Sequence, residues 1–376
     1  MRIQSIDYLR GLMSLSIVFY HFTTSFTSWG LNDSGALLGR LGVYAVSAFY
    51  IISGMALYLA HKNDKWSLNS YLIFVFRRFL RLAPVYWIAI IIFTAFAFQY
   101  INGFSIDNWK YIQNVFLIFG ITNPTEYMIM GGWSIGNEVV FYLFFPLFIL
   151  MCKDKRTVIV LSVLALTALL YCSGAYLDPS KGIVEQWARY INPFNQIYFF
   201  IFGIVAAKLL LPFVGKNKAL FSCFAIATFI AFCLYPVEGN QIKIITGVNK
   251  LFFTVVTIFI CSAFFLIGDL VSLKLLHGIL KFLGDVSYPL YLLHGVSFSY
   301  FSQIVFYKGM SDSMLITYGA CLLVMLLVLS WICHIGIERP MIKLGRYVKN
   351  NDAVFDASIV KNGAETGQDS GTHRQF

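Results

Sequence analysis

The chain has 376 residues, of which 59% are hydrophobic and only 12% charged, and its mean hydropathy is +0.73. A soluble domain carries about 25% charged residues, and no water-soluble fold of this length could bury so much apolar surface. The composition therefore excludes a soluble globular protein and predicts an all-α, polytopic integral membrane protein.

Long apolar segments recur along the chain. A helix needs about 20 mainly apolar residues to cross the hydrocarbon core of a bilayer. The sequence offers ten such segments, which predict ten transmembrane helices at 9–26, 41–60, 82–100, 133–151, 158–177, 191–211, 220–235, 251–267, 283–306 and 314–337. The segment 109–121 is apolar but too short to span, and it predicts a re-entrant or interfacial helix.

Positive charge is distributed unevenly between the connecting segments. If the N-terminus is cytoplasmic, the cytoplasmic segments hold 19 Lys and Arg residues and the external segments hold 7. Because positive residues concentrate on the cytoplasmic side, we expect both termini in the cytoplasm. This bias accounts for most of the net charge of +10, so a nucleic-acid partner is not needed. We predict one membrane domain at 1–350 and a polar, disordered cytoplasmic tail at 351–376.

The first predicted span carries ionisable groups, which are costly in a membrane and commonly functional. Arg10 and His21 are eleven positions apart, which places them on one helical face about 16 Å apart along the axis. Asp7 precedes Arg10 by three residues. The alternative interpretation is structural: an Asp7–Arg10 pair at the interface and an imidazole packed against a polar neighbour.

Two further groups are predicted at a depth similar to that of His21. Glu138 lies about 7 Å below the start of the span 133–151, and His294 lies about 15 Å from Gly284. In a hydrocarbon core near 30 Å thick, two histidines and a carboxylate can supply a general base and its orienting partner. The structural alternative for His294 is a hydrogen bond to a backbone carbonyl or to a nearby tyrosine.

Basic residues precede the third predicted span. Arg78 and Arg81 are spaced i,i+3 on a helical approach, and Pro84 is expected in the first turn of the span. Two guanidinium groups suit a phosphate or pyrophosphate, although anchoring to anionic lipid explains most such clusters. Ser53 and Gly54 in the second span would let helices approach closely. No cysteine or histidine spacing suits a metal ion, so no metal site is predicted.

Six short fragments follow one another along the sequence. They are Ile-Asp-Tyr-Leu-Arg-Gly at 6–11 followed by His21; Ala-Phe-Tyr-Ile-Ile-Ser-Gly at 48–54; Arg-Phe-Leu-Arg at 78–81 with Pro84 and Tyr86; Trp133, Ser134, Glu138, Phe141, Tyr142 and Pro146; Ser287, Tyr288, Leu290, Tyr291 and His294; and Ile-Glu-Arg-Pro at 337–340. Each fragment is weak by itself. In this order, over residues 6–340, the chain resembles acyltransferase family 3, the membrane-bound O-acyltransferases that modify bacterial surface polysaccharides.

This resemblance implies a function and roles for individual residues. It implies a cytoplasmic acyl-CoA donor, most commonly acetyl-CoA, a hydroxyl of a lipid-linked or exported carbohydrate as acceptor, and a place in the bacterial cytoplasmic (inner) membrane. Arg10 and His21 match the pair needed for transfer, with His21 as general base or transient acyl carrier, and Glu138 would orient the imidazole or the sugar. Donor binding is implied for Arg77, Arg78 and Arg81, and substrate-binding or supporting roles for Asp7, Ser53, Trp133, Tyr142, His294 and Glu338.

Two other classes of protein remain as alternatives. A transporter or flippase of a lipid-linked glycan would also have many spans and buried charges, and it would move its substrate without covalent change. The chain has no internal repeat, which disfavours the common transporter architectures. The second alternative is a non-catalytic assembly or sensor component. The ordered set of motifs favours the enzyme.

Overall fold

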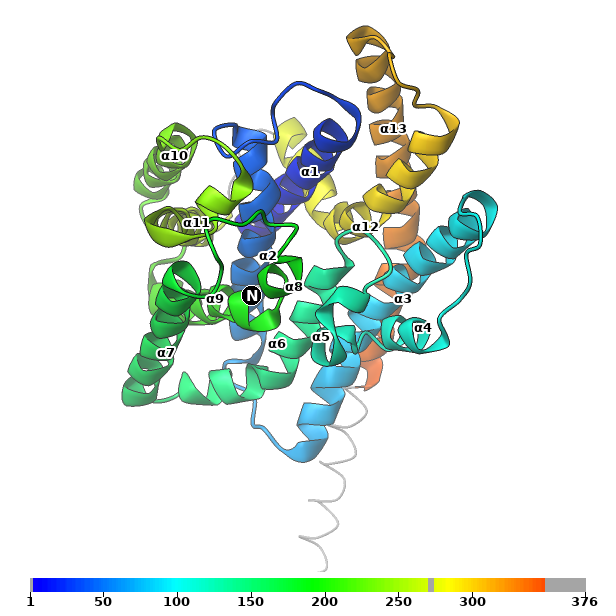
Figure 1. Ribbon diagram of the computed structural model, residues 1–376. Helices are drawn as coiled ribbons and strands as arrows, with labels where there is room; N and C mark the ends of the chain where they lie inside the picture. The colour runs from blue at the N-terminus through cyan, green and yellow to red at the C-terminus, as the bar shows by residue number, and fades with distance from the viewer. Residues whose placement is uncertain (1–2, 270–273, 349–376) are drawn as a thin grey trace, which may run out of the picture.

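The computed structural model describes residues 3–269 and 274–348, and this part of the chain is built from helices joined by short connections (Figure 1). The longer helices are α1 (Gln4–Phe26), α2 (Leu37–His61), α3 (Leu68–Tyr100), α6 (Gly132–Met151), α7 (Lys155–Gly174), α9 (Ile197–Leu210), α10 (Lys218–Leu234), α11 (Gly247–Ile267), α12 (Lys274–Ile304) and α13 (Asp312–Cys333). The short helices are α4 (Asn108–Val115), α5 (Phe119–Thr122) and α8 (Trp187–Tyr190), and a π-helix, His334–Glu338, follows α13. The predicted tail at 351–376 lies outside the described residues.

Each of the ten predicted spans overlaps one of the longer helices. Within residues 3–269 and 274–348, six helices are long and apolar enough to cross a membrane: α2, α3, α6, α7, α11 and the continuous helix Asp312–Val348. Helices α9 and α10 are apolar but shorter. The structure therefore shows an all-α, multi-pass membrane protein, and the count of ten spans stays a prediction. Helices α1 and α12, which are not among the six, carry Arg10, His21 and His294.

Two helices begin earlier than predicted. Helix α3 begins at Leu68 rather than at 82, because Ser67 and Ser70 form a capping box in which each side chain accepts a hydrogen bond from the other's backbone N–H. The three arginines therefore lie inside the helix, and the prediction that Pro84 occupies a first turn is wrong. A proline inside a membrane helix is tolerated where neighbours satisfy the freed backbone groups. Within the described residues, helix α12 begins at Lys274 rather than at 283.

Contacts between connecting segments agree with helices that alternate in direction. The backbone N–H of Ser5, at the start of α1, donates to the Gly268 carbonyl after α11 at 3.2 Å. At the opposite end of these helices, the Ser34 N–H donates to the Gly239 carbonyl at 2.8 Å. Arg40 donates to backbone carbonyls at the end of α10, including those of Phe232 and Tyr235. Segments predicted on one side of the membrane thus meet each other, while which side faces the cytoplasm stays a prediction.

Helices α1 and α12 cross at two glycines. A Cβ atom at Gly284 would lie 2.5 Å from the Asp7 carbonyl oxygen, and one at Gly11 would lie 2.6 Å from the Gly284 nitrogen. Small residues allow this approach of two backbones in a membrane. The crossing brings Arg10 against α12, where its Nε donates to Ser287 Oγ at 3.1 Å.

We expect Gly284→Ala to destabilise the protein by about 1–3 kcal/mol, because the added methyl group overpacks the crossing. The melting temperature of the detergent-purified protein should fall by a few degrees. Gly278→Ala is the matched control on the same helix, since a Cβ atom there has no heavy atom within 4 Å. Equal melting temperatures for the two variants would contradict a sterically fixed crossing.

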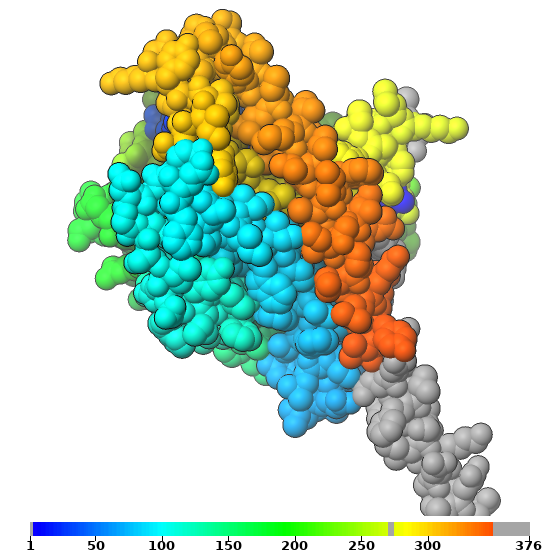
Figure 2. Space-filling view, turned by 90° about the vertical axis from the view of Figure 1, so that its right-hand side faces the viewer, coloured from blue at the N-terminus to red at the C-terminus, as the bar shows by residue number. Residues whose placement is uncertain are grey.

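Helix α13 lies at the outside of the molecule. Figure 2 shows it running across one face beside α3. Its π-helical continuation packs against α3, and Gly345 further on lies against Arg77. The end of the described chain thus returns to the arginines of α3.

Candidate active site

One polar cavity of about 370 Å³ lies between α1, α2, α3, α6, α12 and the segment after α13. Its polar lining comes from residues far apart in the sequence: Asp7, Arg10, Tyr50, Ser53, Arg78, Arg81, Ser134, Glu138, Ser287, Tyr288, Tyr291, Glu338 and Arg346. Seven residues that were given a site role from the sequence share this cavity, namely Asp7, Arg10, Ser53, Arg78, Arg81, Glu138 and Glu338. We take it as the candidate active site.

Arg10 is held at the wall of this cavity by hydrogen bonds. One of its terminal nitrogens, Nη2, donates to Asp7 Oδ1 at 3.0 Å and to the Gly284 carbonyl at 3.3 Å. Its Nε donates to Ser287 at 3.1 Å. The ion pair expected from the structural alternative is therefore present, and the same guanidinium group also faces the cavity. The two interpretations of Arg10 are compatible.

Arg78 and Arg81 project from one face of α3 into the cavity. The Arg78 guanidinium lies over the rings of Phe74 and Tyr142, at 5.5 and 6.0 Å from their centroids. Its Nε is buried and has no hydrogen-bond partner in the described part of the chain. A cation held by aromatic faces keeps its N–H donors available for an anionic ligand.

Arg77 occupies a different position from its two neighbours. It is partly exposed and packs against Gly345, and it is not part of the cavity wall. Arg346, which follows Gly345 in the chain, does line the cavity. Sequence reasoning counted Arg346 only among the positive residues of the predicted cytoplasmic side, and no local pattern distinguishes it there.

Glu138 lies among arginines. The Tyr142 hydroxyl donates a hydrogen bond to Glu138 Oε2 and lies 3.3 Å from Ser53 Oγ. Arg10, Arg78 and Arg81 line the same cavity as the Glu138 carboxylate. In the described part of the chain Glu138 thus contacts Tyr142, one turn further along α6, and its role in orienting the imidazole or the sugar stays a prediction.

We expect Glu138→Gln to lower turnover by about 10–100-fold, the effect of losing a charge-assisted interaction worth about 1.5–3 kcal/mol. The substitution keeps the shape of the side chain, so the amount of protein in the membrane should change little. Specific activity per mole of folded protein is the measurement. Glu126→Gln is the control, since Glu126 pairs with Lys110 at 3.5 Å outside the cavity. If only the yield of Glu138→Gln falls, the carboxylate is structural.

The two membrane histidines lie against each other. Their rings stack with centroids 5.3 Å apart and planes 25° apart. Because Arg10 and His21 both contact α12, the prediction that they share one face of α1 is confirmed. Neither histidine is part of the cavity wall in the described residues. Tyr291 connects the cavity to His294. It lines the cavity, its hydroxyl lies 2.8 Å from Ser134 Oγ, and its ring centroid lies 5.8 Å from that of His294.

The π-helix after α13 directs Glu338 into the cavity. Glu338 is 7% exposed, and its Oε2 lies 2.7 Å from Nδ1 of His334. Arg81 and Glu338 line the same cavity. Single π-helical turns within longer helices occur frequently at functional sites, and sequence periodicity gave no signal for this one.

Trp133 lies outside the cavity, although the motif comparison singled it out. It is 7% exposed, and its ring contacts those of Trp187 and Tyr190 at 6.1 and 5.8 Å. Trp187 in turn donates a hydrogen bond to the Tyr127 hydroxyl at 2.9 Å. A supporting role for Trp133 stays a prediction.

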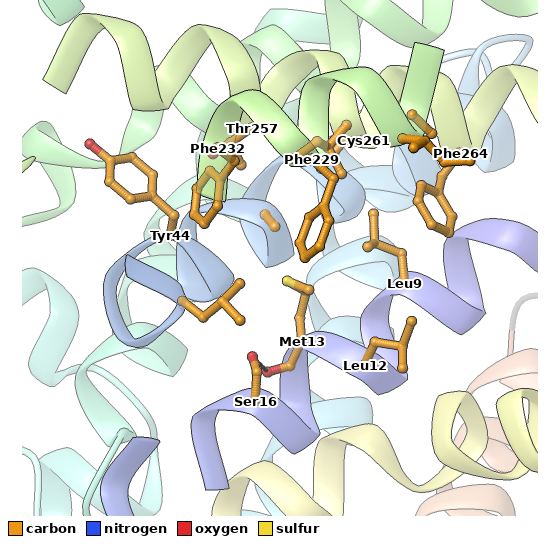
Figure 3. A pocket seen from close by; sticks show the side chains of 15 residues that line it. Leu9, Leu12, Met13, Ser16, Tyr44, Phe229, Phe232, Thr257, Cys261 and Phe264 are labelled. Atoms are coloured by element: carbon orange, nitrogen blue, oxygen red, sulfur yellow. Dashed lines mark hydrogen bonds between the residues drawn. The ribbon is translucent and has the colours of Figure 1, made fainter. Parts of the chain in front are cut away.

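A second cavity, of about 440 Å³, has a different character (Figure 3). Leu12 and Met13 of α1 face Phe229 and Phe232 of α10 across it. Among the described residues, no charged side chain lines it. Such a lining suits hydrocarbon and brings together no histidine or carboxylate, so the polar cavity remains the candidate site.

The geometry agrees with a comparison to known families. A family model described as an acyltransferase domain, that of acyltransferase family 3, matches residues 3–335. The chain belongs to acyltransferase family 3. The match confirms the resemblance drawn from the motifs, and it covers the cavity residues of this acyltransferase up to Tyr291. Glu338 and Arg346 lie beyond it.

Curated relatives of the chain are named as acyltransferases or O-acetyltransferases. The acyltransferase is 28% identical over 167 residues to a peptidoglycan O-acetyltransferase, OatA, of Listeria monocytogenes, covering 40% of this chain and 24% of that protein. It is 24% identical to the acyltransferase MdmB of Streptomyces mycarofaciens, over 91% of this chain and 92% of that protein. A putative O-acetyltransferase of Staphylococcus aureus is 24% identical over 78% of this chain and 50% of that protein. The chain thus spans about a quarter of the length of the Listeria relative and about half of the length of the Staphylococcus relative. No solved structure matches it significantly.

Proposed function

We propose that this acyltransferase moves an acyl group, in the first instance acetyl, from cytoplasmic acyl-CoA to a hydroxyl of a lipid-linked or exported carbohydrate. The observation that carries the proposal is the polar cavity that joins Arg10, Arg78, Arg81 and Glu138 and is also lined by Tyr291, whose ring lies 5.8 Å from that of His294. The name of the Listeria relative supports a carbohydrate acceptor. The bacterial cytoplasmic membrane, with both termini inside, is part of this proposal.

The charges of the cavity support a phosphate-bearing donor. Four guanidinium groups line it, those of Arg10, Arg78, Arg81 and Arg346, against the three carboxylates of Asp7, Glu138 and Glu338. Two of these carboxylates are already engaged, since Asp7 pairs with Arg10 and Glu338 with His334. Guanidinium groups bind phosphate through paired N–H donors. The CoA phosphates would stay at the arginines while the acyl-bearing arm extends toward the histidines.

In the proposed reaction His21 is the general base. It takes the proton from the acceptor hydroxyl, whose oxygen attacks the thioester carbonyl carbon. A C–O bond forms and the C–S bond breaks, and the thiolate of CoA takes up the proton. General base catalysis of this kind contributes about 10²–10⁴-fold. His21 is partly exposed, which leaves it accessible to a hydroxyl.

The test uses membranes from cells with and without the protein. Acetyl-CoA labelled in its acetyl group is supplied, and label is followed into the lipid-linked and surface glycan fractions. Label in glycan only when the protein is present is the expected result. The transporter alternative predicts movement of glycan across the membrane with no label incorporated, and that outcome would contradict the enzyme.

A further inference from the structure

His294 has a hydrogen bond that fixes the position of its ring proton. Its Nδ1 lies 2.6 Å from the backbone carbonyl oxygen of Tyr291. A carbonyl oxygen can only accept, so Nδ1 must carry the hydrogen. In the neutral imidazole, Nε2 is then a bare lone pair. The backbone of α12 therefore sets the tautomer of this histidine.

The lone pair on His294 Nε2 is buried and has no partner in the described part of the chain. The residue is 0% exposed. Its ring is surrounded by the rings of His21, Tyr291 and Phe298, with centroids at 5.3, 5.8 and 5.6 Å. A buried acceptor without a donor costs about 1–3 kcal/mol. Such a group in a native structure calls for an explanation.

The position of the ring proton of His21 is not fixed by its observed contacts. Its ring contacts, with Tyr20 at 5.0 Å and His294 at 5.3 Å, are made through ring faces and edges. These contacts leave open which of its nitrogens carries the hydrogen. A general base requires its lone pair on the nitrogen that faces the substrate, and a hydrogen bond to the other nitrogen normally sets this. For Glu138, which the resemblance implies would orient the imidazole or the sugar, the observed hydrogen bond is with Tyr142.

We propose that His294 is the positioning residue for His21. Its Nε2 accepts a hydrogen bond from the N–H of His21, so that the other His21 nitrogen holds the lone pair that takes the hydroxyl proton. The order of donors and acceptors runs from His21 N–H to His294 Nε2, and from His294 Nδ1–H to the Tyr291 carbonyl. In this structure the rings are stacked, and a turn of the His21 ring about its side-chain torsions completes the contact. The inference rests on the proposed function.

Substitutions that mimic one ring nitrogen at a time separate this role from a structural one. His294→Asn keeps an amide donor near the Nδ1 position and places nothing at Nε2. His294→Gln places an amide group near the Nε2 position. We expect His294→Asn to lower kcat for acetyl transfer by about 10–100-fold with the KM for acetyl-CoA unchanged, and His294→Gln to recover part of kcat. A purely structural role predicts wild-type kcat in every His294→Asn molecule that folds.

His61→Asn is the matched control, since His61 is 3% exposed and its Nδ1 lies 2.8 Å from Asp64 Oδ2, away from the cavity wall. Its kcat should equal that of wild type. If His294→Asn does not fold, kcat is measured instead for His294→Gln, alone and combined with His21→Ala. A combined loss no larger than that of His21→Ala supports action through His21, and a fully additive loss overturns it. Wild-type labelling with unchanged kcat in His294→Asn overturns only this inference, whereas no labelling by the wild type overturns the proposed function as well.

Discussion

His21→Ala is expected to lower acetyl transfer by about 10²–10⁴-fold, the contribution of a general base, while the protein remains in the membrane. His21 is partly exposed and its partners are the rings of Tyr20 and His294, so its removal leaves the helix contacts of α1 largely intact. The measurement is label transferred from acetyl-CoA to glycan per mole of membrane protein. Thr24→Ala, an exposed residue one turn further along α1, should retain full activity.

The same experiment separates the two chemical roles considered for His21. A general base leaves no label on the protein. A transient acyl carrier would leave acetyl label on the denatured wild-type protein when the acceptor is withheld, and His21→Ala would lose it. Full transfer activity in His21→Ala would remove the histidine from the mechanism altogether.

Replacing Arg78 and Arg81 together by alanine is expected to raise the apparent KM for acetyl-CoA by about 10–100-fold. Each charge-assisted hydrogen bond to a phosphate is worth about 1.5–3 kcal/mol, and both guanidinium groups face the cavity. The KM for the proposed carbohydrate acceptor should change little, because the proposed mechanism places the acceptor at the histidines rather than at the arginines. Initial rates at varied donor and fixed acceptor measure this.

The control for this pair removes the same charge elsewhere. Lys153 and Lys155 are exposed at the start of α7, away from the cavity, and their joint replacement by alanine should leave the donor KM unchanged. If the two double variants behave alike, the arginines only anchor the protein to anionic lipid. Replacing the arginines by lysine should give an intermediate KM, since lysine keeps the charge but loses the planar fork of donors.

Properties that depend on neighbouring residues in the chain could be predicted from the sequence. Long apolar segments located the ten longer helices, because the length needed to cross a bilayer is a local requirement. The 3.6-residue period placed Arg10 and His21 on one face, and both contact α12. The same local reasoning failed at the start of α3. There the predicted span began at residue 82, just after the arginines, whereas the helix already begins at Leu68, after the cap at Ser67.

By itself the sequence determined the fold class, the family and most of the residues that meet in the cavity. Only the tertiary structure decided which of those residues touch. It joined His21 to His294 and Arg78 to Tyr142, and it brought Arg346 to the arginines of α3. The physical reason is that helices of similar hydropathy can pack in many orders. Close crossings such as that of Gly11 and Gly284, between residues far apart in the chain, select one order and so set the direction of each side chain.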